Sequence, residues 1–181
     1  MKSFYLLSAF GKDRPGMVSQ VTRLVFELRG NIEDASMTRL GGEFAMMLVI
    51  GLPNAGAGAR LTKSLPPLQK KHGLAVSAKP IAAGLARVRR PSQATHLISV
   101  YGTDRPGIVY RITRTIADQR VNITDLNTRI LKRSGKALYV MLLEVQIPSR
   151  AKAQALERRL KRLGRALRLD VTLHGIEPVV L

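Results

Sequence analysis

Two copies of one short pattern carry the residues of this chain whose types and spacing could do chemistry. Gly-x-Asp-Arg-Pro-Gly begins at Gly11 and returns at Gly102, each time followed by a hydrophobic residue and a valine. A glycine at the end of a strand lets the backbone turn sharply, and a proline shortly before a helix presets φ for its first turn. The first turn of a helix presents unpartnered N–H groups at its positive end, where anions bind. The pattern therefore predicts two anion-binding turns, each suited to a carboxylate such as that of a free amino acid.

Polar side chains beside each turn could complete a site for a molecule with both charges. The aspartate of each pattern could accept a hydrogen bond from an ammonium group, and an asparagine at the start of the next strand could both donate and accept. The candidate ligand-binding residues are Asp13, Arg14, Gly16, Met17, Val18 and Asn31 in the first half and Asp104, Arg105, Gly107, Ile108, Val109 and Asn122 in the second.

Each of these residue types also has a purely structural interpretation. An aspartate before a helix commonly caps its first turn. An asparagine after a helix can hold a left-handed turn. The second glycine of each pattern could be required for close backbone packing with or without a ligand, and the arginines could be solvated or paired with an acid. The sequence alone leaves both interpretations open.

The repeated pattern belongs to a larger internal repeat. From Phe4 to Asp34, 14 of 31 positions are identical to the residues that stand 91 positions later. Helical and alternating spacings of hydrophobic residues predict the order strand, helix, strand, strand, helix, strand in each half. In the first half these elements are expected at Phe4–Phe10, Met17–Leu28, Ile32–Leu40, Glu43–Leu52, Ala59–His72 and Leu74–Ala78.

The order βαββαβ is typical of a ferredoxin-like α+β fold, with an antiparallel sheet and both helices on one face. We expect two such modules, at residues 1–80 and 94–181, joined by a linker at 81–93. The helix Ala59–His72 contains Pro66-Pro67 and is expected to kink or start late. The helix Arg150–Leu163 is expected to stop at Gly164, and the second hairpin to turn near Ser134-Gly135. Met46, Met47 and Met141 are expected to pack in the cores.

The net charge of +18 is spread over the whole chain, and its densest part is Arg150–Arg168, with eight basic residues and one acid. Such a helix could lie along phosphate groups. Its leucines are needed for the core, however, so a solvated polar face explains the same pattern. Aromatic residues make up 4% of the chain. We therefore expect no sequence-specific DNA recognition, while the charge allows non-specific binding of polyanions or of an acidic protein partner.

Several classes of function are disfavoured by what the sequence contains. The chain has no cysteine, and its three histidines stand in dissimilar contexts, so neither a metal site nor a cofactor is expected. No serine–histidine–aspartate, paired-carboxylate or nucleotide-loop pattern surrounds the histidines, and we expect no enzyme. No run of 18 apolar residues predicts a membrane span. We expect a cytoplasmic protein.

The repeated residues resemble a known family. A strand followed by Gly-x-Asp-Arg-Pro-Gly-(Met/Ile)-Val and a helix, with Asn-Ile at the next strand, is similar to the ACT domain. Two such domains in a chain of this size are similar to the glycine cleavage system transcriptional repressor group. The resemblance implies that a small amino acid, glycine or serine first, binds at this loop where two domains lie side by side.

The resemblance also implies a role. We expect a regulatory protein that senses an amino acid through an allosteric change of domain arrangement and controls a transcriptional regulator or a metabolic enzyme. A homodimer is expected, because sheet edges and helices of such domains commonly pair. The alternative is a basic scaffold protein that binds nucleic acid or an acidic partner without any amino-acid ligand.

Overall fold

The computed structural model describes residues 2–86, 94–133 and 136–176 and divides the chain into two compact units, residues 1–89 and 90–181. We call the two units module 1 and module 2. Module 1 contains β1 (Ser3–Lys12), α1 (Met17–Glu27), β2 (Asn31–Leu40), β3 (Glu43–Leu52), α2 (Ala55–His72), β4 (Ala75–Ile81) and α3 (Ala83–Ala86). Module 2 contains β5 (His96–Gly102), α4 (Ile108–Ala117), β6 (Asn122–Arg133), β7 (Lys136–Gln146), α5 (Arg150–Leu167) and β8 (Leu169–Gly175).

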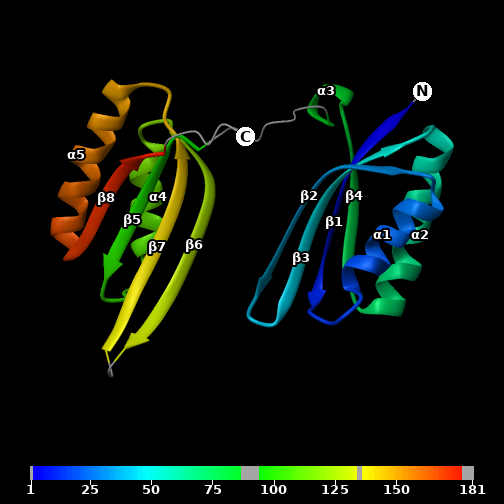
Figure 1. Cartoon of the computed structure of the whole chain (residues 1–181), viewed down its shortest axis with the longest axis horizontal. Coiled ribbons are helices and arrows are strands. Elements are labelled where there is room, and N and C mark those ends of the chain that lie inside the picture. Colours follow the sequence, from blue (N-terminus) through cyan, green and yellow to red (C-terminus); the bar gives the residue numbers. More distant parts are fainter. Residues whose placement is uncertain (1, 87–93, 134–135, 177–181) are drawn as a thin grey trace. The chain divides into compact units, whose positions relative to one another are not determined.

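Both modules have the same sheet topology. The strand order is β2-β3-β1-β4 in module 1 and β6-β7-β5-β8 in module 2, and every neighbouring pair is antiparallel. Two helices cover one face of each sheet (Figure 1). The predicted α+β class, with two ferredoxin-like βαββαβ modules, is confirmed.

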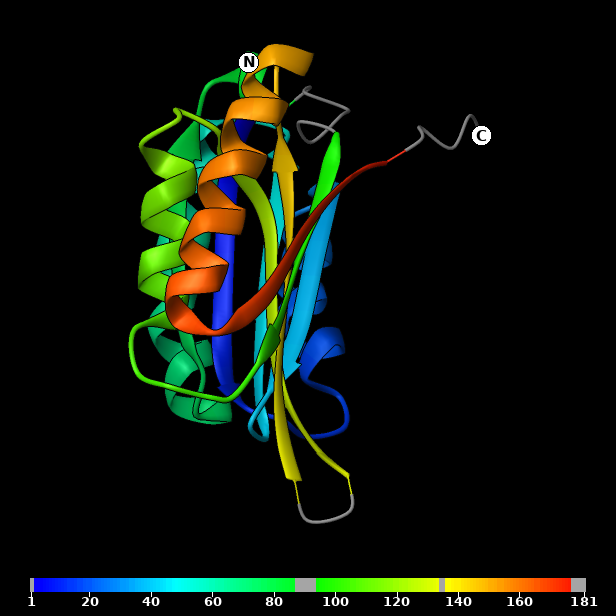
Figure 2. The same cartoon turned by 90° about the vertical axis from the view of Figure 1, so that its left-hand side faces the viewer.

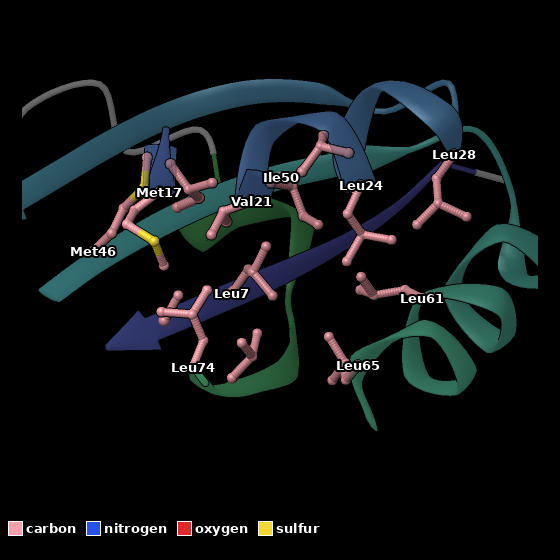
Figure 3. Close-up of a cluster of buried hydrophobic side chains, with 14 of the residues drawn as sticks. Leu7, Met17, Val21, Leu24, Leu28, Met46, Ile50, Leu61, Leu65 and Leu74 are labelled. Atoms are coloured by element: carbon pink, nitrogen blue, oxygen red, sulfur yellow. The ribbon is translucent and has the colours of Figure 1, made fainter. Parts of the chain in front are cut away.

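Each core lies between the helices and one face of the sheet. In β3 every second side chain from Phe44 to Leu52 is buried, as the two-residue period of a strand requires when one face is covered. Side chains of α1 and α2 meet this face of the sheet. Figure 3 shows Val21 and Leu24 from α1 and Leu61 from α2 near Leu7 of β1. Met46 and Met141 are buried as predicted, but Met47 points to the open face and is 53% exposed, so that prediction was wrong for Met47.

Glycines and arginines in the left-handed conformation end the local elements. Gly41 and Gly42 have φ values of 61° and 83° and turn the predicted hairpin between β2 and β3, as a two-residue turn with two positive φ angles requires. After α1 and α4 the left-handed residues are Arg29 and Arg120, each with φ of 53°. Asn122 and its counterpart in module 1 instead begin strands. The structural interpretation, in which the asparagines hold these turns, is therefore wrong.

The helix α2 begins earlier than predicted and runs through both prolines to His72. Asn54 caps it, because its side-chain oxygen accepts a hydrogen bond from the N–H of Ala57 at 2.9 Å. Two buried leucines, Leu61 and Leu65, hold the helix against the sheet before the prolines are reached. Because Asn54 caps α2, the helix starts at Ala55 and not at the predicted Ala59.

The helix α5 does not stop at Gly164 but continues to Leu167, where Arg168 with φ of 54° ends it. Gly164 is buried against β8, and a Cβ atom there would lie 2.9 Å from the carbonyl oxygen of Leu169 and 2.9 Å from Cγ2 of Val171. This glycine is therefore a contact point between helix and sheet and not a stop signal.

The segment 81–93, expected to be a linker, is partly structured. Ile81 is the last residue of β4, and α3 follows directly and packs against β1 and β3. The rest of the segment, and the hairpin turn expected at Ser134-Gly135, lie outside the described residues.

Gly164→Ala is expected to lower the free energy of unfolding of module 2. The added methyl group gains helix propensity, but overpacking against a backbone carbonyl costs about 1–3 kcal/mol, and we expect a net loss of about 1 kcal/mol. Denaturant unfolding measures it. Ala166→Gly, at an exposed position of the same helix, is the control that reports propensity alone. A variant Gly164→Ala as stable as the parent chain would contradict the close contact.

Candidate functional site

The loop between the first strand and first helix of each module is built around a left-handed glycine. Gly16 and Gly107 stand directly before α1 and α4 with φ of 92° and 90°, and no side chain caps either helix. The structural interpretation, in which Asp13 and Asp104 cap these helices, is therefore wrong. A Cβ atom on Gly16 would meet nothing closer than Ser19 Oγ at 3.8 Å, so the glycine is required for its φ angle and not for close packing.

The first turn of each helix offers the backbone donors that the sequence predicted. The first helical hydrogen bonds run from Gln20 N to Gly16 O and from Arg111 N to Gly107 O, both at 3.0 Å. In the described part of module 1, no backbone acceptor faces the N–H groups of Val18 and Ser19. Neither helix carries an acid in its first turn. Both turns can therefore hold an anion without displacing a group of the protein.

In module 1 this loop borders an open hollow of about 470 Å³. The hollow brings together five of the six candidates of the first half with residues from the neighbouring hairpin, which the sequence analysis did not identify. Its lining is Asp13, Arg14, Pro15, Gly16, Met17, Val18, Met37, Arg39 and Phe44.

The aspartates of the two loops have different surroundings. Asp13 accepts from Arg39 Nη1 at 3.3 Å, and its backbone N–H donates to Gly42 O at 2.9 Å. In module 2 the position that corresponds to Arg39 in the strand register is Ile130. Within the described residues of module 2, Asp104 forms no ion pair. Its carboxylate is therefore the more available acceptor for a ligand's ammonium group.

The buried side chain of Tyr139 lies close enough to Asp104 to feel its charge. Tyr139 takes the place of Phe44 beside the loop, and its hydroxyl donates to Met141 Sδ at 3.7 Å. Burial raises the pKa of Tyr139, and the nearby carboxylate of Asp104 raises this pKa further. Both effects favour the neutral form of Tyr139.

The asparagines lie apart from the loops. Asn31 pairs with Gly51 of β3, whereas the loop leaves the sheet beside Phe44, seven residues away along the same strand. At about 3.4 Å per residue this separates the two places by roughly 24 Å. Asn122 has the same position in module 2, opposite Gln146. Within one module, no single amino acid can touch both the loop and the asparagine.

The two loop arginines also differ from each other. Arg14 Nη2 donates to the carbonyl oxygen of His72 at 2.6 Å, at the negative end of α2. Arg14 therefore ties the loop to the second helix and does not pair with an acid. In the described part of module 2, Arg105 makes no such hydrogen bond and is exposed.

Nothing in the described residues points to metal chemistry or membrane insertion. No group of three or more histidine and acidic side chains could hold a metal ion among the residues that the structure describes. The helices of the described ranges are too short or too polar to cross a membrane.

Comparison with known proteins identifies the same repeat. The family model of the ACT domain matches this chain twice, at residues 3–79 and 94–174. The glycine cleavage system transcriptional repressor of Escherichia coli K12 is 30% identical over 179 residues, which cover 98% of this chain and 90% of that protein. The protein of the same name from Shigella flexneri matches equally.

Two crystal structures share the fold over nearly the whole chain. An unknown protein from Galdieria sulphuraria is 25% identical with a TM-score of 0.77, and the match covers 98% of this chain and all of that one. A protein described as a glycine cleavage system transcriptional repressor is 22% identical with a TM-score of 0.70, and the match covers 98% and 99% of the two chains.

Arg14→Gln is expected to lower the free energy of unfolding of module 1 by about 1 kcal/mol, because the charge-assisted hydrogen bond to the end of α2 is lost on a partly solvated surface. Arg105→Gln is the matched control, since it removes the same charge from the equivalent position without a hydrogen bond, and it should change stability by less than about 0.5 kcal/mol. Equal effects of the two substitutions in thermal unfolding would contradict the tie between Arg14 and α2.

Proposed function

We propose that this chain, which belongs to the ACT domain family, is a regulatory protein that binds a small amino acid at its two strand–helix loops. The chain is a tandem ACT-domain protein similar over nearly its full length to a glycine cleavage system transcriptional repressor, and it is a regulator and not an enzyme. The observation that carries the proposal is the pair of uncapped helix starts, each with an aspartate beside it.

The chemistry of the loop fits both charged groups of an amino acid. The carboxylate would accept hydrogen bonds from the free N–H groups of the first helical turn, as anions do at helix N-termini. The ammonium group would donate to the aspartate of the loop. Met37, Arg39 and Phe44 from the hairpin complete the lining of the hollow in module 1. Glycine or serine is the first candidate ligand, on the family resemblance alone.

Module 2 is proposed as the stronger site. An ammonium group that approaches Asp13 must compete with Arg39, which already pairs with this carboxylate. The position equivalent to Arg39 is Ile130, and the nearby Tyr139 is neutral, so a ligand's positive charge would be the main partner of the Asp104 carboxylate. An ammonium group at Asp104 would form an ion pair without displacing an existing one.

The asparagines can belong to the ligand site only if a second surface meets the loop. The family resemblance suggests such a meeting of domains, and occupancy of the site would then favour one domain arrangement over another. We propose that this change alters the contact of the chain with a transcriptional regulator or a metabolic enzyme in the cytoplasm. The size of the effect is limited by the difference in ligand affinity between the two arrangements.

Asp104→Asn is expected to weaken the binding of the amino acid at least tenfold, because the amide cannot compensate the ammonium charge. The measurement is the rise in melting temperature with ligand concentration for glycine, serine and a panel of other amino acids. Asp118→Asn, just after α4 and outside the loop, removes the same charge and is the matched control.

Asp13→Asn is expected to have the smaller effect of the two loop substitutions. A response that survives both loop substitutions together would show that the ligand binds elsewhere. A response lost in Asn31→Ala or Asn122→Ala, with the fold intact, would place an asparagine in the site.

A further inference from the structure

The outer side of α5 carries a dense block of positive charge that the amino-acid site does not use. Seven of its residues are lysine or arginine, and Glu157 is its one acid. Glu157 is occupied, because it accepts from Lys161 Nζ at 2.7 Å. In the described residues none of the arginines of α5 forms an ion pair.

The helical period places these arginines in a line. The buried side of α5 is formed by Ala153, Leu156, Leu160 and Gly164. At 100° per residue, Arg158, Arg162 and Arg165 lie along the opposite side, with successive Cα atoms about 6 and 4.5 Å apart along the axis. All three are exposed. We call these three residues the arginine row.

The neighbouring helix extends the positive surface. Figure 2 shows α5 in orange beside α4 in green on the same face of the sheet of module 2. Asp118, the residue after α4, is already paired, because it accepts from Arg114 Nε at 3.0 Å. A shallow hollow of about 290 Å³ lies in the seam and is lined by Thr115, Asp118, Arg159, Arg162, Leu163 and Ala166.

The side chains between the arginines indicate which kind of partner fits. Protein interfaces bind through buried aromatic or large apolar anchors, but the exposed positions beside the row are Ala151, Gln154 and Ala166. Single-stranded nucleic acid is held by aromatic stacking, and α5 has no aromatic residue. The phosphates of a duplex need only positive charge and N–H donors, and guanidinium groups supply both.

We propose that the arginine row binds the phosphate backbone of double-stranded nucleic acid, without recognising the base sequence. The phosphates of a duplex form a linear array of negative charge, which matches the linear arrangement of the arginine row. The inference is independent of the amino-acid site, because none of its residues belongs to the loop before α4.

The equivalent helix of module 1 lacks this arrangement. Over its 18 residues α2 carries four basic residues, Arg60, Lys63, Lys70 and Lys71, and the exposed Pro66 and Pro67 stand between them. The two modules have similar net charges, +8 for residues 1–89 (13 basic minus 5 acidic residues) and +10 for residues 90–181 (17 minus 7). Total charge therefore does not distinguish the modules, whereas the row does.

The test is binding of the full chain to a fluorescent 20-base-pair duplex of random sequence, measured by anisotropy between 50 and 200 mM KCl. Each phosphate contact contributes about −0.9 to the slope of log K against log salt concentration. Arg158→Gln, Arg162→Gln and Arg165→Gln together should reduce the slope by about 2.7 and weaken binding at 50 mM at least tenfold. Lys63→Gln, Lys70→Gln and Lys71→Gln together remove the same charge from α2 and should leave the slope near that of the parent chain.

Three further measurements decide between the alternatives. Replacement of the three row arginines by lysine should keep most of the affinity, because phosphate contacts depend mainly on charge. No binding at 50 mM KCl, or equal losses in the two glutamine variants, would overturn the proposal. Binding of polyglutamate to the row as tightly as the duplex would show that the partner is an acidic protein. Thermal unfolding of each variant checks that the exposed substitutions leave the fold intact.

Discussion

The one-sided burial of the central strands is the constraint on which each module depends. Alternate side chains of β1 and β3, and of β5 and β7, must enter the core, so both helices cover the same face of the sheet. The chain therefore has to leave the end of the first strand and start a helix on that face within a few residues. A glycine with a positive φ angle makes this turn, and it leaves the first N–H groups of the helix open. The feature that permits the fold is thus also the feature that can bind an anion.

The repeated backbone carries two different electrostatic environments. Arg39 of β2 compensates Asp13, and Arg14 fastens the same loop to the end of α2. In module 2 an isoleucine and a buried tyrosine stand near Asp104 instead. The two loops therefore have equal geometry and unequal charge. Sequence identity in the pattern itself does not reveal this, because the differences come from residues of the hairpins.

The sequence predicted most of the fold and only part of the candidate site. Hydrophobic spacing identified both βαββαβ modules, and the repeated pattern located the two loops, because both depend on local periodicity and on glycine. The contribution of Arg39 depends on the register between β2 and β3, which local patterns do not give. The distance of Asn31 from the loop follows from strand direction in the same way. Gly164 was misjudged because its contact partner, β8, lies beyond the end of the helix.

Calorimetric titration shows directly whether the loops bind a free amino acid. Extensively dialysed full-length chain would be titrated with a panel of amino acids at a salt concentration that suppresses non-specific anion binding. We expect saturable heat with one or two small amino acids. The binding should persist at high salt, because the proposed site combines contacts to both charges of the ligand with directed hydrogen bonds. No heat with any amino acid, from a chain shown to be folded, would contradict the claim.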